Sequence, residues 1–440
     1  MLGNTVKKGT VLDRILCFGK RLLSKLIPPI YRQDPSVRRK IYQWLLIGLL
    51  IRLFFMPITV HGDLLNVYYR SSFIAYQGTR WLQFSPLLTT YLHAFFLWIF
   101  KPLMPYMVSI FGTENYGIPI IVHPYVFRTL FLLKVPYLLF DLGCAFLLLA
   151  ILQDKRKGLA VFIFWMVNPV VILASYFWAR YEPVAIFFVL LSLYYARKSF
   201  PAKSSFCLGV SSIIRFYPLI LLPFFVIILG KRLGQRLKLA FWGVLPLGIT
   251  SILPRLFHQA GEAETLTKIY HANYLFAMKF YLGYLYDNIY IFPLGASVLL
   301  LYAYFKTDHS FVSLWKTALI LLLVFFATCF FHPQYFMWLM PLLALQVVEN
   351  KKFIGLFIVQ VLFFMVYTFQ FGSHAAGFFF TPLNFDYFSR LATPLGIISR
   401  YYPAASFIGM FRSLFSAICL WMAYLVLREF PAAKEVQLRG

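Results

Sequence analysis

Long apolar runs recur along the whole chain, and short clusters of lysine and arginine separate them. A helix that rises about 1.5 Å per residue crosses a hydrocarbon core of roughly 30 Å in about 20 residues, which is the order of length of these runs. Strands of a membrane β-barrel alternate between apolar and polar residues with period two. The runs in this chain are continuously apolar, as in membrane helices. The pattern therefore predicts an all-α polytopic membrane protein.

The positions of the basic clusters predict the topology. Lysine and arginine are dense from Lys7 to Lys40, and no apolar run precedes them as a cleaved signal. Since basic loops stay in the cytoplasm, we expect a cytoplasmic basic segment over 1–40, a single transmembrane domain over 41–428 and a cytoplasmic tail over 429–440. Alternating the later basic clusters with the apolar runs gives roughly twelve spans. These clusters are Lys155-Arg156-Lys157, Arg197-Lys198, Lys231-Arg232 and Lys351-Lys352.

The later basic clusters fall on the cytoplasmic side only if residues of about 61–128 form one long outer loop. Two stretches in it, 64–76 and 86–103, have helical character, but His93, Lys101 and several aromatic residues favour helices that lie at the membrane surface. The second stretch could instead be a true span. The later basic clusters would then lie outside, which the charge bias opposes.

Composition narrows the class of protein further. A mean hydropathy of +0.75 with 13% charged residues excludes a water-soluble globule with one core. The net charge of +26 would suit nucleic acid, but the basic residues follow the loop pattern of a membrane protein, so we expect no nucleic-acid partner. The five cysteines show no paired spacing, which predicts neither a disulfide framework nor a metal site. Signatures of nucleotide hydrolysis and of metalloproteases are missing.

Asp63 stands out among the polar residues because it follows the first apolar run directly, in His61-Gly62-Asp63. A carboxylate beside a low-dielectric wall is expected to have a raised pKa and can take a proton from a hydroxyl. The alternative is structural, since aspartate is a favoured N-cap for the helix expected to begin near Leu64.

Arg215 lies deep in an apolar stretch, 204–229, that has cytoplasmic signals on both sides. Pro218 disfavours a continuous helix there, so we expect a hairpin of two short helices with Arg215 at the turn, on the same side as Asp63. A cation in such a place costs several kcal/mol unless it meets an anion or water. A lipid phosphate would satisfy it with two parallel hydrogen bonds.

The other candidates lie in segments expected at the outer face, 175–182, 257–288, 332–334 and 372–405. Arg180 and Glu182 could position a sugar or a phosphate, or could form only a local ion pair across their turn. His332 could bind phosphate or orient an acceptor, or could be an ordinary interfacial residue. Asp141 lies within the second apolar run, where it needs a partner and is expected to serve helix packing. Further possible contacts are Asp287, Asp386, Lys268, Lys279, Arg390 and Arg400.

Several segments, taken in order, resemble the GT-C fold family of polyprenyl-phosphate-sugar-dependent glycosyltransferases. They are Val60-His61-Gly62-Asp63-Leu64, Phe84-Ser85-Pro86-Leu87-Leu88, Asn168-Pro169 leading to Arg180-Tyr181-Glu182-Pro183, Ile214-Arg215-Phe216-Tyr217-Pro218-Leu219, and His332-Pro333-Gln334-Tyr335-Phe336-Met337-Trp338. The last is similar to the Gln-Tyr-x-x-Trp region of the first mannosyltransferases of GPI-anchor synthesis.

The resemblance implies an inverting transfer of mannose or another hexose from a polyprenyl phosphate to a glycolipid, glycan or protein at the extracytoplasmic face. It implies Asp63 as general base and Arg215 as the cation that neutralises the departing phosphate. The other substrate-binding residues that it implies are Arg180, Glu182, His332, Gln334, Tyr217 and His61. Many relatives carry a second carboxylate beside the first; Gly62-Asp63-Leu64 has none, which makes dependence on a divalent metal doubtful and leaves the role of Glu182 as a second acid open.

Membrane lipids are expected partners, and a prokaryotic plasma membrane is favoured over the endoplasmic reticulum. Two other function classes stay open. A transporter or flippase of lipid-linked sugars would share the topology, but no internal repeat is visible and the polar residues concentrate at one face. A polysaccharide polymerase or ligase would carry a long basic outer loop late in the chain, for which 372–405 would qualify.

Overall fold

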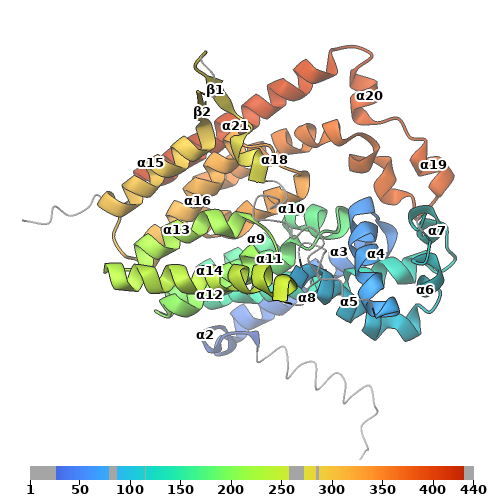
Figure 1. The fold of residues 1–440 in the computed structure, drawn as a ribbon, viewed down its shortest axis with the longest axis horizontal. Helices are drawn as coiled ribbons and strands as arrows, with labels where there is room; N and C mark the ends of the chain where they lie inside the picture. The colour runs from blue at the N-terminus through green and yellow to red at the C-terminus, as the bar shows by residue number, and fades with distance from the viewer. Residues whose placement is uncertain (1–25, 79–86, 114, 257–271, 284–286, 431–440) are drawn as a thin grey trace, which may run out of the picture.

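The structure is a computed structural model that describes residues 26–78, 87–113, 115–256, 272–283 and 287–430 (Figure 1). Several sequence predictions lie outside these residues: the basic segment before position 26, the Phe84-Ser85-Pro86 part of the second family segment, Lys268 with most of 257–288, and the tail from 431. The described chain is helical apart from turns and one antiparallel hairpin of β1 (Lys279–Tyr281) and β2 (Asn288–Tyr290), in which Phe280 lies opposite Ile289.

Within the described residues, most helices follow one another after a connection of a few residues. In chain order they are α2 (Pro29–Arg32), α3 (Pro35–Ile58), α4 (Gly62–Gln77), α5 (Leu87–Phe100), η1 (Lys101–Leu103), α6 (Met107–Ile110), α7 (Gly117–Ile121), α8 (Val126–Ile151), α9 (Lys155–Met166), α10 (Pro169–Ile172), η2 (Leu173–Phe177), α11 (Glu182–Arg197), α12 (Pro201–Ser212), α13 (Tyr217–Leu229), α14 (Leu233–Leu256), η4 (Ala272–Phe276), α15 (Ile291–Lys306), α16 (Phe311–Thr328), η5 (Pro333–Leu339), α17 (Met340–Glu349), α18 (Lys352–Tyr367), η6 (Thr368–Ala375), η7 (Gly377–Phe380), α19 (Phe385–Ser389), α20 (Pro394–Ile398) and α21 (Ala404–Arg428).

Five helical segments of the described chain are long and apolar enough to cross a membrane: α3, α8, α16, α18 continued by η6, and α21. A sixth joins if α9 and the helix from Pro169 to Phe177, bent by 43°, count as one span. The fold is thus all-α and compatible with a multi-pass membrane protein. Roughly twelve spans remain a prediction, because other apolar segments such as α13 and α15 are shorter than the roughly 20 residues that a straight span needs.

Local sequence sets the ends of the first span. Asp34 caps α3 by accepting hydrogen bonds from the backbone N–H groups of Ser36 and Val37, and Pro35 occupies the first helical position. The helix therefore begins before position 41, and its first two turns carry basic residues. It ends at Ile58, and Thr59 is extended. The chain then enters α4 at Gly62, so His61 lies between the two helices and Asp63 lies in the first turn of the second.

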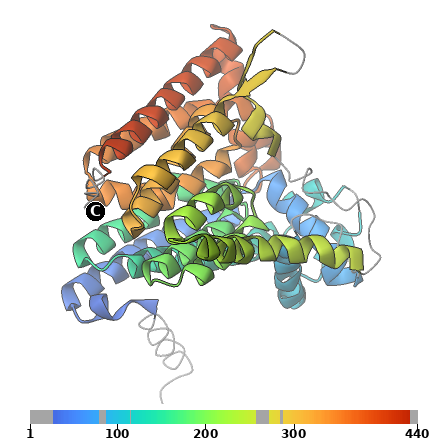
Figure 2. The same cartoon turned by 60° about the vertical axis from the view of Figure 1, so that its left-hand side comes forward.

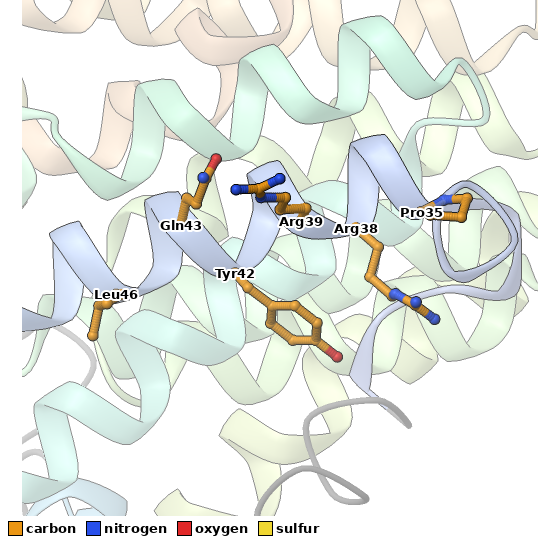
Figure 3. Close-up of a pocket in the computed structure, with 6 residues that line it drawn as sticks. All are labelled: Pro35, Arg38, Arg39, Tyr42, Gln43 and Leu46. Atoms are coloured by element: carbon orange, nitrogen blue, oxygen red, sulfur yellow. The ribbon is translucent and has the colours of Figure 1, made fainter.

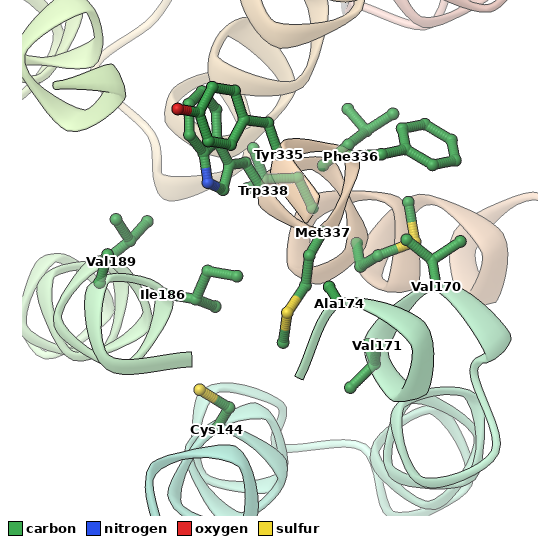
Figure 4. Close-up of a cluster of buried hydrophobic side chains, with 14 of the residues drawn as sticks. Cys144, Val170, Val171, Ala174, Ile186, Val189, Tyr335, Phe336, Met337 and Trp338 are labelled. Carbon is green, nitrogen blue, oxygen red and sulfur yellow. The ribbon is translucent and has the colours of Figure 1, made fainter. Parts of the chain in front are cut away.

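The core is built around α8, which packs against α3, α9 and α11, while α16, α18 and α21 pack together on another side (Figures 1 and 2). Figure 4 shows one part of this core, in which Met337 of η5 extends between Ile186 of α11 and Ala174 of η2, toward Cys144 of α8. Close packing at this point fixes η5 against the two helices that flank the turn at 178–181.

A buried ion pair joins α3 to α8. Arg52 Nε donates to Asp141 Oδ2 at 2.6 Å, and both side chains are fully buried. Trp165 Nε1 and the Tyr176 hydroxyl donate to the same carboxylate at 2.7 Å each. The expectation that Asp141 has a partner and serves helix packing is confirmed. Arg52, which the sequence analysis did not single out, is that partner.

The hairpin expected around Arg215 is also confirmed. The helices α12 and α13 pack against each other, and Arg215 lies in the turn between them. The two helical stretches expected in the first loop correspond to α4 and α5, which also pack together.

Candidate functional site

Asp63 lies in the first turn of α4, but it does not cap that helix. His61 is the N-cap residue, and its Nδ1 accepts the backbone N–H of Asp63 at 3.1 Å. The alternative reading of Asp63 as a helix cap is therefore wrong. Its carboxylate stays available for other contacts, and one third of the side-chain surface is exposed. An acidic group in the first turn is also favoured by the helix dipole.

Arg180 is the cation beside this carboxylate, with its Nε 3.4 Å from Asp63 Oδ2. The preceding residue, Ala179, is buried and has φ of +46°, a left-handed conformation that costs a non-glycine residue about 1 to 3 kcal/mol. This strained turn separates η2 from α11 and directs Arg180 toward Asp63. The strain is compensated by the surrounding core, which is typical of functional sites.

Glu182 and Arg215 form a second ion pair next to the first. Arg215 Nη2 lies 2.6 Å from Glu182 Oε1, and both side chains are buried. The Tyr181 ring lies near both arginines, with its centroid 4.0 Å from Arg215 Cζ and 5.1 Å from Arg180 Cζ. Arg180 and Glu182 do not pair with each other across their turn, so that alternative is wrong. Each pairs instead with a residue from a distant segment.

These contacts produce an alternating array of two carboxylates and two guanidinium groups. Asp63 comes from the start of α4, Arg180 and Glu182 from the turn before α11, and Arg215 from the turn between α12 and α13. The array is neutral overall, so its charges are compensated inside a largely apolar core. A buried cation is tolerated where it meets an anion, as the sequence analysis required for Arg215.

His332 and Gln334 belong to the segment that begins η5. His332 Nε2 lies 3.3 Å from the Tyr274 hydroxyl, and its ring packs edge-on against Tyr335 and Phe330. Burial lowers the pKa of His332, with the nearby Asp63 opposing the effect and Arg180 adding to it. His332 therefore stands close enough to the array to interact with its charges.

An aromatic stack adjoins Arg215. The Trp338 ring is stacked between Tyr217 and Tyr335, with centroid separations of 4.2 Å on both sides, and Figure 4 shows the Tyr335 and Trp338 rings together. Arg215 Cζ lies 5.3 Å from the Tyr335 ring. The stack holds the Tyr217 hydroxyl and the guanidinium of Arg215 in fixed relation.

Several polar atoms around the array are buried without a hydrogen bond among the described residues. They are His61 Nε2, Glu182 Oε2, Arg215 Nε, the Tyr217 hydroxyl, Gln334 Oε1 and Trp338 Nε1. Native interiors contain few such atoms, and a cluster of them is a feature of sites that accommodate polar ligands or water. Donors and acceptors are both represented, which suits a ligand with hydroxyl or phosphate groups.

The electrostatics of Asp63 differ from the expectation. Burial alone would raise its pKa, but Arg180 and His61 hold the pKa of the carboxyl below its usual 3.8. Arg215 and His332 lower this pKa further by smaller amounts. The predicted raised pKa is therefore wrong, because sequence alone did not show the neighbouring cation. Burial lowers the pKa of His61 to about 4, so His61 is neutral at pH 7. Its Nδ1 accepts a hydrogen bond from the backbone N–H of Asp63, so in the neutral ring the hydrogen is on Nε2.

Ion-pair and ring contacts thus connect one cluster of predicted residues, and Gln334 lies buried one position before Tyr335 of that cluster. The connected residues are His61, Asp63, Arg180, Glu182, Arg215, Tyr217 and His332. His374, from the outer segment 372–405, also adjoins the site, because its ring centroid lies 5.5 Å from that of His61. The sequence did not single out His374. The other weak candidates differ: Asp386 and Arg390 pair with each other one helical turn apart and are more than four-fifths exposed.

No group of three or more His, Cys, Asp or Glu side chains within the described ranges is arranged to hold a metal ion. A pocket of about 510 Å³ lies at the beginning of α3, at the other end of this helix from His61 (Figure 3). It is lined by Pro35, Arg38, Arg39, Tyr42, Gln43 and Leu46, none of which belongs to the predicted site.

Comparison with protein-family models, with curated proteins and with solved structures finds no match to this chain. Its function is therefore inferred from the side chains described above.

Proposed function

We propose that the protein is an inverting glycosyltransferase of the GT-C type, with roughly twelve spans, that uses a polyprenyl-phosphate sugar as donor. The observation that carries the proposal is the array of Asp63, Arg180, Glu182 and Arg215, assembled from three distant segments. It offers one partly exposed carboxylate beside Arg180, and a second arginine, Arg215, in the adjoining ion pair with Glu182. A reaction in which a hydroxyl loses a proton while a phosphate departs needs these two kinds of group side by side.

In the proposed reaction the hydroxyl oxygen of the acceptor attacks the anomeric carbon of the donor sugar. The bond from this carbon to the phosphate oxygen breaks, and its electron pair leaves with polyprenyl phosphate. The proton of the hydroxyl passes to Asp63. Because its pKa is lowered, Asp63 is ionised at neutral pH and free to accept that proton, although it is a weak base. Transfer to it is favourable only once the hydroxyl oxygen has begun to bond to carbon.

The arginines have the complementary role. Arg215 lies within reach of Glu182 and the aromatic stack, and Arg180 lies beside Asp63, so the positive charge faces the site from two sides. Preorganised cations of this kind stabilise charge that develops on a leaving phosphate. Glu182 keeps Arg215 compensated and oriented. His61, His332, Gln334 and Tyr217 supply the hydrogen-bonding atoms that a sugar ring requires.

The acceptor is a glycolipid, a glycan or a protein, and the sugar is mannose or another hexose. The site lies at the end of α3 opposite to the basic residues of its first turns, and positive-inside topology supports an extracytoplasmic site, in a membrane that we propose to be the plasma membrane. The donor is then lipid-borne, since soluble sugar nucleotides are cytoplasmic.

The test of this function uses the purified protein in nanodiscs with synthetic polyprenyl-phosphate hexoses and a crude lipid extract as acceptor. We expect release of polyprenyl phosphate and a new glycosylated product. The same protein in sealed liposomes should not move the donor between leaflets. Donor movement without a new product would identify a transporter, and elongation of a lipid-linked glycan in blocks would identify a polymerase.

A further inference from the structure

Lys134 is a fully buried lysine of α8 that belongs to none of the contacts described so far. Within the described part of the chain, no carboxylate lies within ion-pair distance of its ammonium group. Its Nζ donates three hydrogen bonds instead, to Met56 O at 3.0 Å, Thr59 O at 2.5 Å and Thr59 Oγ1 at 2.8 Å. The ammonium has three protons, so its donor capacity is fully used.

All three acceptors lie where the first span ends. Met56 is in the last turn of α3, and Thr59 is the first extended residue after it. The final carbonyl groups of a helix have no partner within the helix, and the helix dipole favours a cation at that end. Lys134 thus acts as a cap for α3 that is supplied by a different helix.

Thr59 connects this cap to the turn that carries Arg180. The Thr59 hydroxyl lies 2.7 Å from Tyr176 O and 2.7 Å from Phe55 O, and its single proton serves one of them at a time. The Tyr176 hydroxyl is in turn fixed by Asp141 at 2.7 Å. Lys134 therefore lies where the chain leaving α3 crosses η2.

The two catalytic segments begin at this crossing. Asp63 is four residues beyond Thr59, and Arg180 is four residues beyond Tyr176. The short connection from Thr59 to α4 is fixed at one more point, where the Val60 N–H donates to Phe379 O at 2.9 Å. The separation of Asp63 from Arg180 is consequently set by how the two chains are held at Thr59 and Tyr176.

We propose that Lys134 is a positioning residue for Asp63, which holds the end of α3 against η2 and thereby sets the placement of the carboxylate relative to Arg180. The kinetic consequence rests on the proposed glycosyltransferase function. A misplacement of about 1 Å in a reacting group can cost about 100-fold in rate, so the effect should fall on kcat and much less on the KM for the donor.

The experiment compares Lys134→Met and Thr59→Val with Lys316→Met. Lys316 is the matched control, because it is a buried lysine near the start of α16 that pairs with Glu429 at 3.2 Å, at the opposite end of that helix from His332. We expect Lys134→Met to lower kcat by about 10- to 100-fold with the KM for the donor within about 3-fold, and Thr59→Val to shift kcat in the same direction. Lys316→Met should lower the unfolding temperature while leaving kcat within about 2-fold.

A second readout does not depend on transfer. In a background with the five native cysteines replaced by alanine, Asp63→Cys is labelled with a charged, water-soluble thiol reagent. We expect Lys134→Met to change the labelling rate at Cys-substituted position 63 by at least about 5-fold and Lys316→Met to leave it unchanged. If the parent makes no product, the proposed function fails, and this labelling alone decides the role of Lys134.

The proposal is overturned if Lys134→Met and Lys316→Met lose kcat equally at matched loss of unfolding temperature, or if the labelling rate is the same with and without Lys134. Should Lys134→Met not yield folded protein, Thr59→Val decides, since it removes one acceptor of the ammonium and keeps the shape of the side chain. An unchanged kcat and labelling rate in Thr59→Val would then contradict the proposal.

Discussion

The ion pair of Glu182 and Arg215 allows a direct test of how the site is held together. The perturbations are Glu182→Gln, Arg215→Met and the double variant. Both groups are buried and their charged atoms approach to 2.6 Å, so each single change leaves one uncompensated charge in the core. Removing one partner of a buried pair costs about 3 to 5 kcal/mol. The cation–π contacts of Arg215 with Tyr181 and Tyr335 do not replace the lost carboxylate, since each contributes at most about 2 kcal/mol.

The double variant should lose much less stability than the two single variants together, because it removes both charges. Two charges about 4 Å apart attract by roughly 4 kcal/mol at an effective dielectric constant of 20, so the coupling energy should be about 2 to 4 kcal/mol.

The assay is reversible unfolding in mixed micelles, followed by tryptophan fluorescence and by circular dichroism to check that the transition is two-state. Asp386 and Arg390 provide the matched control, because this pair is more than four-fifths exposed and its cycle should give a coupling near zero. Additive effects of Glu182→Gln and Arg215→Met, within about 0.5 kcal/mol, would refute a structural coupling between the two residues.

Three further predictions follow from the same structure. Burial lowers the pKa values of His61 and His93 to about 4, so between about pH 6.5 and 4 the unfolded chain binds protons that the folded chain excludes. The stability of the folded state is therefore complete above about pH 6.5 and falls by up to about 3 kcal/mol per histidine as the pH drops through this window. Unfolding midpoints at several pH values will show this loss. Asp141→Asn leaves Arg52 without its carboxylate and should cost about 3 to 5 kcal/mol in the same unfolding assay, whereas a loss below about 1 kcal/mol would contradict the packing role. His61→Asn keeps an N-cap acceptor for α4 and His61→Ala removes it, so the alanine variant should be less stable than the asparagine variant by about 1 kcal/mol; equal unfolding midpoints would argue against the cap.

Much of the framework was predictable from the sequence, since apolar runs specify helices and a proline in an apolar run specifies a break. The hairpin around Arg215 and the helices within the first loop follow from these rules. The gathering of Asp63, Arg180, Glu182 and Arg215 was also predictable in outline, because alternation of basic loops assigned their segments to one face.

The pairing within the site could not be predicted. Sequence distance suggested that Arg180 would meet Glu182, but Arg180 pairs with Asp63 and Glu182 pairs with Arg215, each more than 30 residues away. The sign of the pKa shift at Asp63 depends on that pairing, so it was predicted wrongly. Arg52 and Lys134 were missed because a cation inside an apolar run indicates only that some partner exists. The partner of Lys134 is a helix end 75 residues away, which no local pattern reveals.

The most direct test of the central claim is transfer from a polyprenyl-phosphate hexose by Asp63→Asn, compared with the parent and with Asp386→Asn. Asp386 is an exposed carboxylate of the outer segment that pairs only weakly with Arg390, at 3.9 Å. If Asp63 is the general base, Asp63→Asn should lower the transfer rate by about 100- to 10,000-fold while donor binding stays close to that of the parent, and Asp386→Asn should transfer normally. A transfer rate in Asp63→Asn within about 3-fold of the parent would contradict the account, because the proton of the acceptor would then have another destination.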